Sequence, residues 1–180
     1  MAKHTRRKTA GQSPPERAPV GPNADPQQLR FYALEREEIG ARDYARLTIA
    51  KCKQVARSVC RAYHVPQVQV RRAVIERWAA DWTPRRGIYL SKSIGTATDL
   101  LTILHELAHH VHYWSTPAKA YNTHQDHGPE FVACYLSILE HVRLMPRDAL
   151  ATVLERRGLK YLMPGPSPTT LRKVLRCSIG

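Results

Sequence analysis

Long apolar stretches are missing from this sequence. No run of eighteen consecutive apolar residues occurs among its 180 residues, so we expect no membrane-spanning helix. The N-terminal stretch MAKHTRRKTAGQSPPERAPVGPNADP is basic, but no apolar segment follows its charges. This pattern argues against a secretory signal or a membrane anchor, and we expect a cytoplasmic protein.

Paired cysteines are also missing. The four cysteines lie far apart, and none forms a CxxC pair: Cys52, Cys60, Cys134 and Cys177. This spacing favours reduced thiols over a disulfide framework or a zinc ribbon. Internal repeats are absent as well.

The length and the apolar content of 43% fit one domain with tails. The first 26 residues are rich in Pro, Gly, Ser and charge, a composition typical of disordered segments. We therefore divide the chain into a disordered basic tail at 1–26, a folded domain at 27–158 and a basic C-terminal extension at 159–180.

Acidic residues are scarce: 15 Asp and Glu face 28 Lys and Arg, a net charge of +13. Residues 46–92 alone carry eleven basic residues against two acids. Such a surface attracts a polyanion, most commonly nucleic acid, and the tails could dock onto a larger assembly. The alternative is a basic protein with no nucleic-acid role, and no helix-turn-helix or RNA-recognition motif decides between them.

The hydrophobic pattern predicts an α+β fold. Helical spacing is present at 27–38 and 42–63, and shorter extended stretches follow at 68–75 and 87–91. Three further helices are predicted at 97–114, from 129 to about 142, and at 146–157.

The helix predicted at 97–114 contains LTILHELAHHVHYW. Thr96 and Asp99 suit its N-terminus, and apolar residues cover most of its circumference, so the helix should be central and buried. His105 and His109 are four residues apart and project from one face, where they can converge on one cation. With Glu106 they form the HExxH pattern, in which the glutamate reaches a water on the metal without binding the metal.

A catalytic zinc site also needs a third protein ligand and an open position. His127 is the best candidate, because the following Gly128 and Pro129 suit a turn and the start of a helix that packs on the first. His124 is its rival. The alternatives are core histidines satisfied by hydrogen bonds, or a closed structural zinc site, which normally has a fourth protein ligand.

HELAH followed by HGPEF and an aromatic-led helix resembles the small SprT-like metallopeptidases of bacteria and their phages, over roughly residues 45–145. The resemblance implies a zincin-like fold, with a small antiparallel sheet packed on the HExxH helix and flanking helices. It implies one Zn²⁺ per chain on His105, His109 and His127, with Glu106 as general base. A phage-encoded member would be intracellular or virion-associated. Because this chain has no CxxC ribbon, substrate and DNA dependence do not carry over.

These residues predict hydrolysis of a protein or peptide substrate. Zinc lowers the pKa of a bound water to about 7, and Glu106 accepts its proton and passes it to the leaving amine. Tyr121 and His124 are candidate donors to the oxyanion. Asp126 could orient a ligand histidine, although a loop or capping carboxylate is the more common role.

Two further predictions concern the surroundings of the site. The stretch GIYLS at 87–91 is expected to be an edge strand that pairs with extended substrate. For His64, His110, His112 and His141 we expect surface or packing roles, with His112 alternatively lining the cleft.

A different class of function remains open. The zincin core could serve as a catalytically idle scaffold in a structural or nucleic-acid-associated protein, for instance in a phage particle. The intact Glu106 favours the enzyme, because a scaffold needs no general base.

Overall fold

The computed structural model describes residues 26–39, 46–75, 79–94, 99–121 and 127–161. These residues form a mixed α and β fold, as predicted. In chain order the elements are α1 (Pro26–Leu34), η1 (Glu35–Ile39), α2 (Ile49–Ala62), β1 (Val70–Ala73), β2 (Ala80–Thr83), β3 (Gly87–Ser91), α3 (Leu100–Ser115), α4 (Ala118–Tyr121), α5 (Pro129–His141) and α6 (Arg147–Arg156). No helix among the described residues is long and apolar enough to cross a bilayer.

The sheet differs from the prediction in two ways. Its order is β1-β3-β2, and β3 runs parallel to β1 and antiparallel to β2, so the sheet is mixed rather than antiparallel. GIYLS therefore forms the central strand, and its prediction as an edge strand was wrong. Its residues are buried on both faces apart from the half-buried Tyr89, whereas exposed arginines and Asp81 lie on its two neighbours. Charged residues are typical of edge strands.

Gly87 allows β3 to begin next to the chain that leads into β1. Its φ is +86°, and a Cβ at this position would lie 2.5 Å from the carbonyl oxygen of Gln69. The same carbonyl accepts a hydrogen bond from the Ile88 amide at 2.8 Å. Any side chain at this position would thus be strained and would also clash with the backbone.

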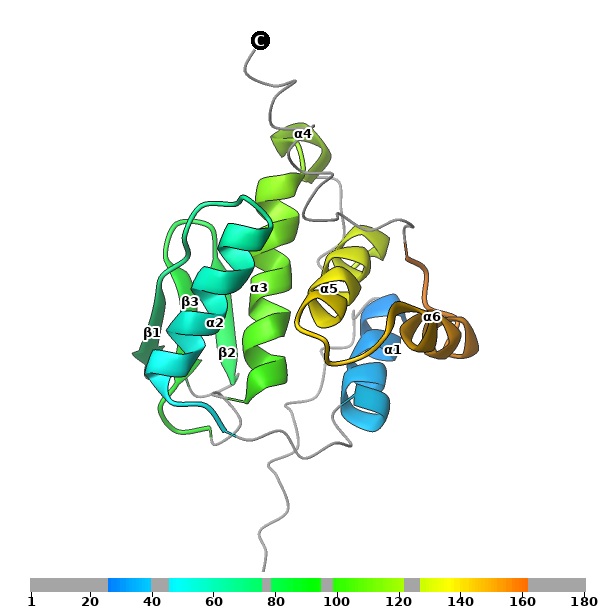
Figure 1. Ribbon diagram of the computed structural model, residues 1–180, viewed down its shortest axis with the longest axis horizontal. Coiled ribbons are helices and arrows are strands. Elements are labelled where there is room, and N and C mark those ends of the chain that lie inside the picture. Colours follow the sequence, from blue (N-terminus) through cyan, green and yellow to red (C-terminus); the bar gives the residue numbers. More distant parts are fainter. Residues whose placement is uncertain (1–25, 40–45, 76–78, 95–98, 122–126, 162–180) are drawn as a thin grey trace, which may run out of the picture.

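Helices α2 and α3 pack against the sheet (Figure 1). α2 begins at Ile49, later than predicted, because extended Thr48 is its N-cap and its hydroxyl accepts a hydrogen bond from the Lys51 amide at 3.2 Å. The predicted start at 42 lies outside the described residues. The buried stripe of α2 consists of Cys52, Ala56, Val59 and Cys60.

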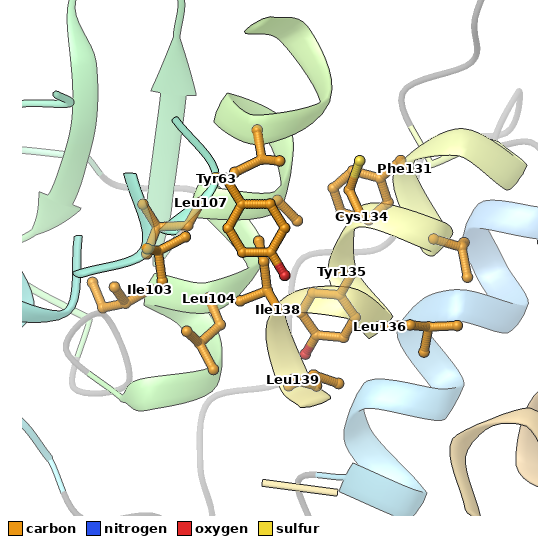
Figure 2. Packing of buried hydrophobic residues seen from close by; sticks show 14 of the residues in the cluster. Tyr63, Ile103, Leu104, Leu107, Phe131, Cys134, Tyr135, Leu136, Ile138 and Leu139 are labelled. Carbon is orange, nitrogen blue, oxygen red and sulfur yellow. The ribbon is translucent and has the colours of Figure 1, made fainter. Parts of the chain in front are cut away.

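α3 is the central helix, and α5 packs along it. Asp99 is its N-cap with an extended backbone, so α3 begins at Leu100 rather than at the predicted Ala97. Figure 2 shows the side chains of α3 and α5 packed together, with Tyr63 at their junction. The Tyr63 hydroxyl is 2.7 Å from the Ser137 hydroxyl, which ties the end of α2 to α5.

The N-terminal helix lies beside α5, on the opposite side of α3 from the sheet (Figure 1). Phe31 contacts the rings of Phe131 and Tyr135, each with its centroid 5.2 Å away and in an edge-on arrangement. At the end of η1, Glu37 and Glu38 form ion pairs with Arg157, which follows α6; the shortest N–O distances are 2.7 and 2.9 Å. The α1–η1 segment thus contacts α5 through Phe31 and contacts the residue that follows α6 through Glu37 and Glu38.

Candidate metal centre

Three histidines meet at one point between α3 and α5. One side-chain nitrogen from each of His105, His109 and His127 lies within 4.8 Å of the others. The Nε2 atoms of His105 and His127 are 3.1 Å apart. Zinc–nitrogen bonds of about 2.0–2.1 Å in tetrahedral geometry separate two ligand nitrogens by roughly 3.3 Å. The three histidines therefore lie close enough together to bind a metal ion.

The local sequence explains how the three rings converge. His105 and His109 occupy successive turns on one face of α3. His127 is held at the start of α5, where Gly128 is the N-cap and Pro129 the first helical residue. The backbone carbonyl of His127 also accepts a hydrogen bond from Gln27 at 3.3 Å. The α1 helix thus helps to fix the third histidine.

The ring of Phe131 covers one side of this cluster. The ring centroid of Phe131 lies 4.3 Å from that of His109 and 4.7 Å from that of His127. Burial holds the pKa of His109 well below its usual range, and repulsion from His105 and then His127 adds to this effect. His109 is therefore neutral, which is the form that binds a metal.

Glu35 is a member of the site that the sequence analysis missed. One of its carboxylate oxygens is 2.9 Å from Nδ1 of His105, and both side chains are buried. The carboxylate accepts the Nδ1 proton, so Nε2 of His105 presents its lone pair to His127 and the shared point. Such a carboxylate orients a ligand imidazole and raises its basicity. The sequence did contain a sign of this role, because Glu35 is a charged residue on the apolar stripe of the N-terminal helical segment, four residues after Phe31.

Tyr32 is the second residue that was missed. Its ring stacks on His105, with centroids 6.0 Å apart and planes inclined by 11°. Its hydroxyl is 3.4 Å from Nε2 of His127. Tyr32 thus faces the same point as the histidines, from a helix that ends 66 residues before α3 begins.

Glu106 lies on α3 between the two helical histidines and is buried, with 8% of its surface exposed. Tyr121, a predicted donor, lies on α4 with its ring centroid 5.2 Å from that of His112 and 4.9 Å from that of Tyr113. These contacts place it beside the last turn of α3, beyond His109. The other two predicted residues, His124 and Asp126, lie outside the described residues.

The sheet supports the site through Trp82 of β2. Its indole stacks on His109, with centroids 6.1 Å apart and planes 8° from parallel. Its Nε1–H donates to Nδ1 of His110 at 3.2 Å, so Nε2 of His110 carries the proton and donates it to the carbonyl of Pro66 at 2.7 Å. His110 is thus a packing residue, as predicted, and it holds the ring that covers His109.

Three further histidines of the described residues are not part of the cluster, although His112 is close enough to His109 to add to the lowering of its pKa. His112 is buried, with 2% of its surface exposed, and its ring contacts Tyr121. His64 and His141 are exposed, as a surface role requires.

Comparisons of the chain with protein-family models, with curated proteins and with solved structures give no match. The resemblance to SprT-like metallopeptidases therefore stays a prediction from HELAH and HGPEF.

Proposed function

We propose that this protein is a zinc-dependent metallopeptidase. The observation that carries the proposal is the convergence of His105, His109 and His127 within 4.8 Å, with Glu106 in the same motif. Imidazole donors suit zinc, and three histidines with an open fourth position are one of the ligand sets of catalytic zinc. A buried carboxylate such as Glu106 needs compensating partners, and a cation on the adjacent histidines would be one.

Each residue has a distinct task in this proposal. The three histidines would hold zinc, which would act as a Lewis acid and lower the pKa of a bound water. Glu106 accepts a proton from the attacking water and delivers it to the leaving amine. Glu35 keeps His105 oriented through the 2.9 Å contact to Nδ1.

The substrate would be an extended peptide, and β2 is the strand that we propose pairs with it. In the described sheet β2 is an edge strand, and its Trp82 stacks on His109. A peptide added to this edge would run beside the histidine cluster and form main-chain hydrogen bonds. β1, the other edge strand, is separated from the cluster by β3 and β2.

The central test is peptide hydrolysis by the zinc-loaded wild type and by Glu106→Gln. The wild type should cleave an unfolded protein such as reduced casein, and Glu106→Gln should lose about 10²–10⁴-fold in kcat at unchanged zinc content. Glu155→Gln, an exposed glutamate of α6, is the matched control. No cleavage by the zinc-loaded wild type, or full activity in Glu106→Gln, would favour the idle scaffold instead.

A specific surface supports a second proposal, association with nucleic acid. Exposed basic residues gather on α2 and the neighbouring strand β1: Lys51, Lys53, Arg57, Arg61, Arg71 and Arg72. Counterion release makes such binding steeply dependent on salt. For a double-stranded DNA probe, Arg57→Gln should lower the slope of log K against log salt by about one, whereas Lys160→Gln should not. Equal slopes for both variants and the wild type would contradict this role for α2.

A further inference from the structure

We infer that Tyr32 is a further catalytic residue, whose hydroxyl donates a hydrogen bond to the substrate oxygen that becomes negatively charged during hydrolysis. This inference rests on the proposed metallopeptidase function and names a donor from α1. The donors expected from the sequence, Tyr121 and His124, belong to the segment between α3 and α5.

The position of the hydroxyl is the first argument. It lies 3.4 Å from Nε2 of His127, and that nitrogen is 3.1 Å from Nε2 of His105. Both nitrogens face the point where a shared metal ion would lie. With a metal held by the three histidines, the Tyr32 hydroxyl would lie beside the group that binds the substrate carbonyl.

The capacity of the phenol to donate is the second argument. The side-chain amide of Gln28 donates to the phenol oxygen of Tyr32 at 3.4 Å. A phenol oxygen that accepts from Gln28 still has its own proton to donate, so the Tyr32 hydroxyl can act as a hydrogen-bond donor beside the histidines. A donor aimed at developing negative charge is what a transition state of peptide hydrolysis requires.

Exposure is the third argument. His105 and His127 are 7% and 6% exposed, whereas Tyr32 and His109 are half-buried. Among these four residues Tyr32 and His109 keep the most exposed surface, and we infer that a substrate approaches the histidines past them. A hydroxyl beside this approach can contact the scissile carbonyl.

The neighbours of Tyr32 hold it in place. Phe31 is fully buried among α5 side chains, and Glu35 is hydrogen-bonded to His105. Arg30 donates to the carbonyl of Gly158 at 2.9 Å, which adds a third attachment of α1. Tyr32 thus projects from a helix fixed on both sides, as a preorganised donor must be.

The chemical step balances without any change in the covalent state of Tyr32. The water oxygen bonds to the carbonyl carbon, the C–N bond breaks, and Glu106 carries one proton from the water to the amine. Tyr32 keeps its proton throughout and only donates a hydrogen bond. Loss of one such donor typically lowers kcat by about 10²–10³-fold.

The test compares Tyr32→Phe with Tyr89→Phe. Tyr89 lies on β3 and points to the opposite face of the sheet from the buried Ile88 and Leu90, so it controls for loss of a tyrosine hydroxyl. Zinc content, kcat and KM for casein, and the affinity of the zinc-loaded proteins for acetohydroxamate, a small oxygen-anion ligand, are measured for both. The midpoint of thermal unfolding confirms that both are folded.

We expect Tyr32→Phe to retain zinc and KM, to lose about 10²-fold or more in kcat, and to bind acetohydroxamate at least about tenfold more weakly. Tyr89→Phe should match the wild type. Equal kcat and equal acetohydroxamate affinity in Tyr32→Phe would overturn the inference and leave the proposed function standing. Loss of zinc from Tyr32→Phe would also overturn it, because Tyr32 would then be a ligand. Weaker acetohydroxamate binding in a protein that hydrolyses nothing would support the position of Tyr32 and overturn the proposed function.

Discussion

The two sides of α3 use histidine for different purposes. On the side that faces α5 and the α1–η1 segment, His105 and His109 point to a site shared with His127. On the side that faces the sheet, His110 lies between the indole of Trp82 and the carbonyl of Pro66. Two adjacent residues of α3 thus differ in role: His109 belongs to the metal-binding geometry, and His110 packs against the sheet.

The partners explain this difference. Both ring nitrogens of His110 are used by protein groups, at 3.2 and 2.7 Å. In His105, Glu35 takes only Nδ1, and Nε2 faces another imidazole nitrogen. A histidine binds a metal only where one nitrogen is left to present its lone pair. The surroundings of each ring, rather than its position in the helix, therefore decide its role.

Removal of a ligand should have the largest effect. His127→Ala should lose its zinc, because two histidines alone make a weak site, whereas His124→Ala should keep it. Elemental analysis of both variants after dialysis against metal-free buffer measures this. Zinc retained in His127→Ala and lost in His124→Ala would move the third ligand to His124.

Removal of His110 should lower stability without affecting zinc binding. His110→Ala leaves the Trp82 N–H and the Pro66 carbonyl without their partner, so the free energy of unfolding should fall by about 1–3 kcal/mol while zinc content is unchanged. Urea denaturation of the metal-free proteins measures the loss. His141→Ala, at the exposed end of α5, should change it by no more than about 0.5 kcal/mol. If His110→Ala loses zinc without losing stability, the contrast between the two sides of α3 fails.

Glu35→Gln tests whether the carboxylate that contacts Nδ1 of His105 strengthens metal binding. Glutamine cannot replace the carboxylate at Nδ1 of His105, so the dissociation constant for zinc should rise by about 10–100-fold. Competition with a chromophoric chelator measures this constant, and Glu155→Gln, on α6, is the control. An unchanged constant would show that Glu35 is not needed to orient His105.

Arg157→Gln should have the smallest effect. A hydrogen bond from Arg36 is the main cause that lowers the pKa of Glu37, and one from Arg157 is the main cause for Glu38. Since both pKa values lie below the ordinary 4.5, the stabilisation is present above pH 4.5 and is lost as pH falls through the lowered values. The exposed pairs are also screened by salt.

The thermal midpoint of Arg157→Gln should therefore lie slightly below that of the wild type at neutral pH. The two midpoints should converge in strong acid or high salt. A difference that persists in acid would show that Arg157 acts through packing instead of through its ion pairs with Glu37 and Glu38.

The parts of the site that depend on local spacing could be predicted from the sequence. His105 and His109 share a helix face because they are four residues apart, and the Gly-Pro step after His127 starts α5. The buried position of α3 followed from its apolar circumference. Each of these features is determined by residues of a single helix or of its first turn.

The two missed residues of the site depend on contacts between distant segments. Glu35 is 70 residues from His105, and Tyr32 is 95 residues from His127. The strand β2 was missed because ADWT is short and half exposed, and the order of the strands depends on which neighbours they find. Hydrophobic periodicity identifies the buried face of an element but not what covers that face.

The most direct test of the account is the zinc stoichiometry of the wild type, measured by calorimetric titration of zinc into the metal-free protein and checked by elemental analysis. The account predicts one tightly bound zinc per chain, lost on replacement of His105, His109 or His127. A wild type that binds no zinc under these conditions would contradict it, because the three histidines would then serve packing alone.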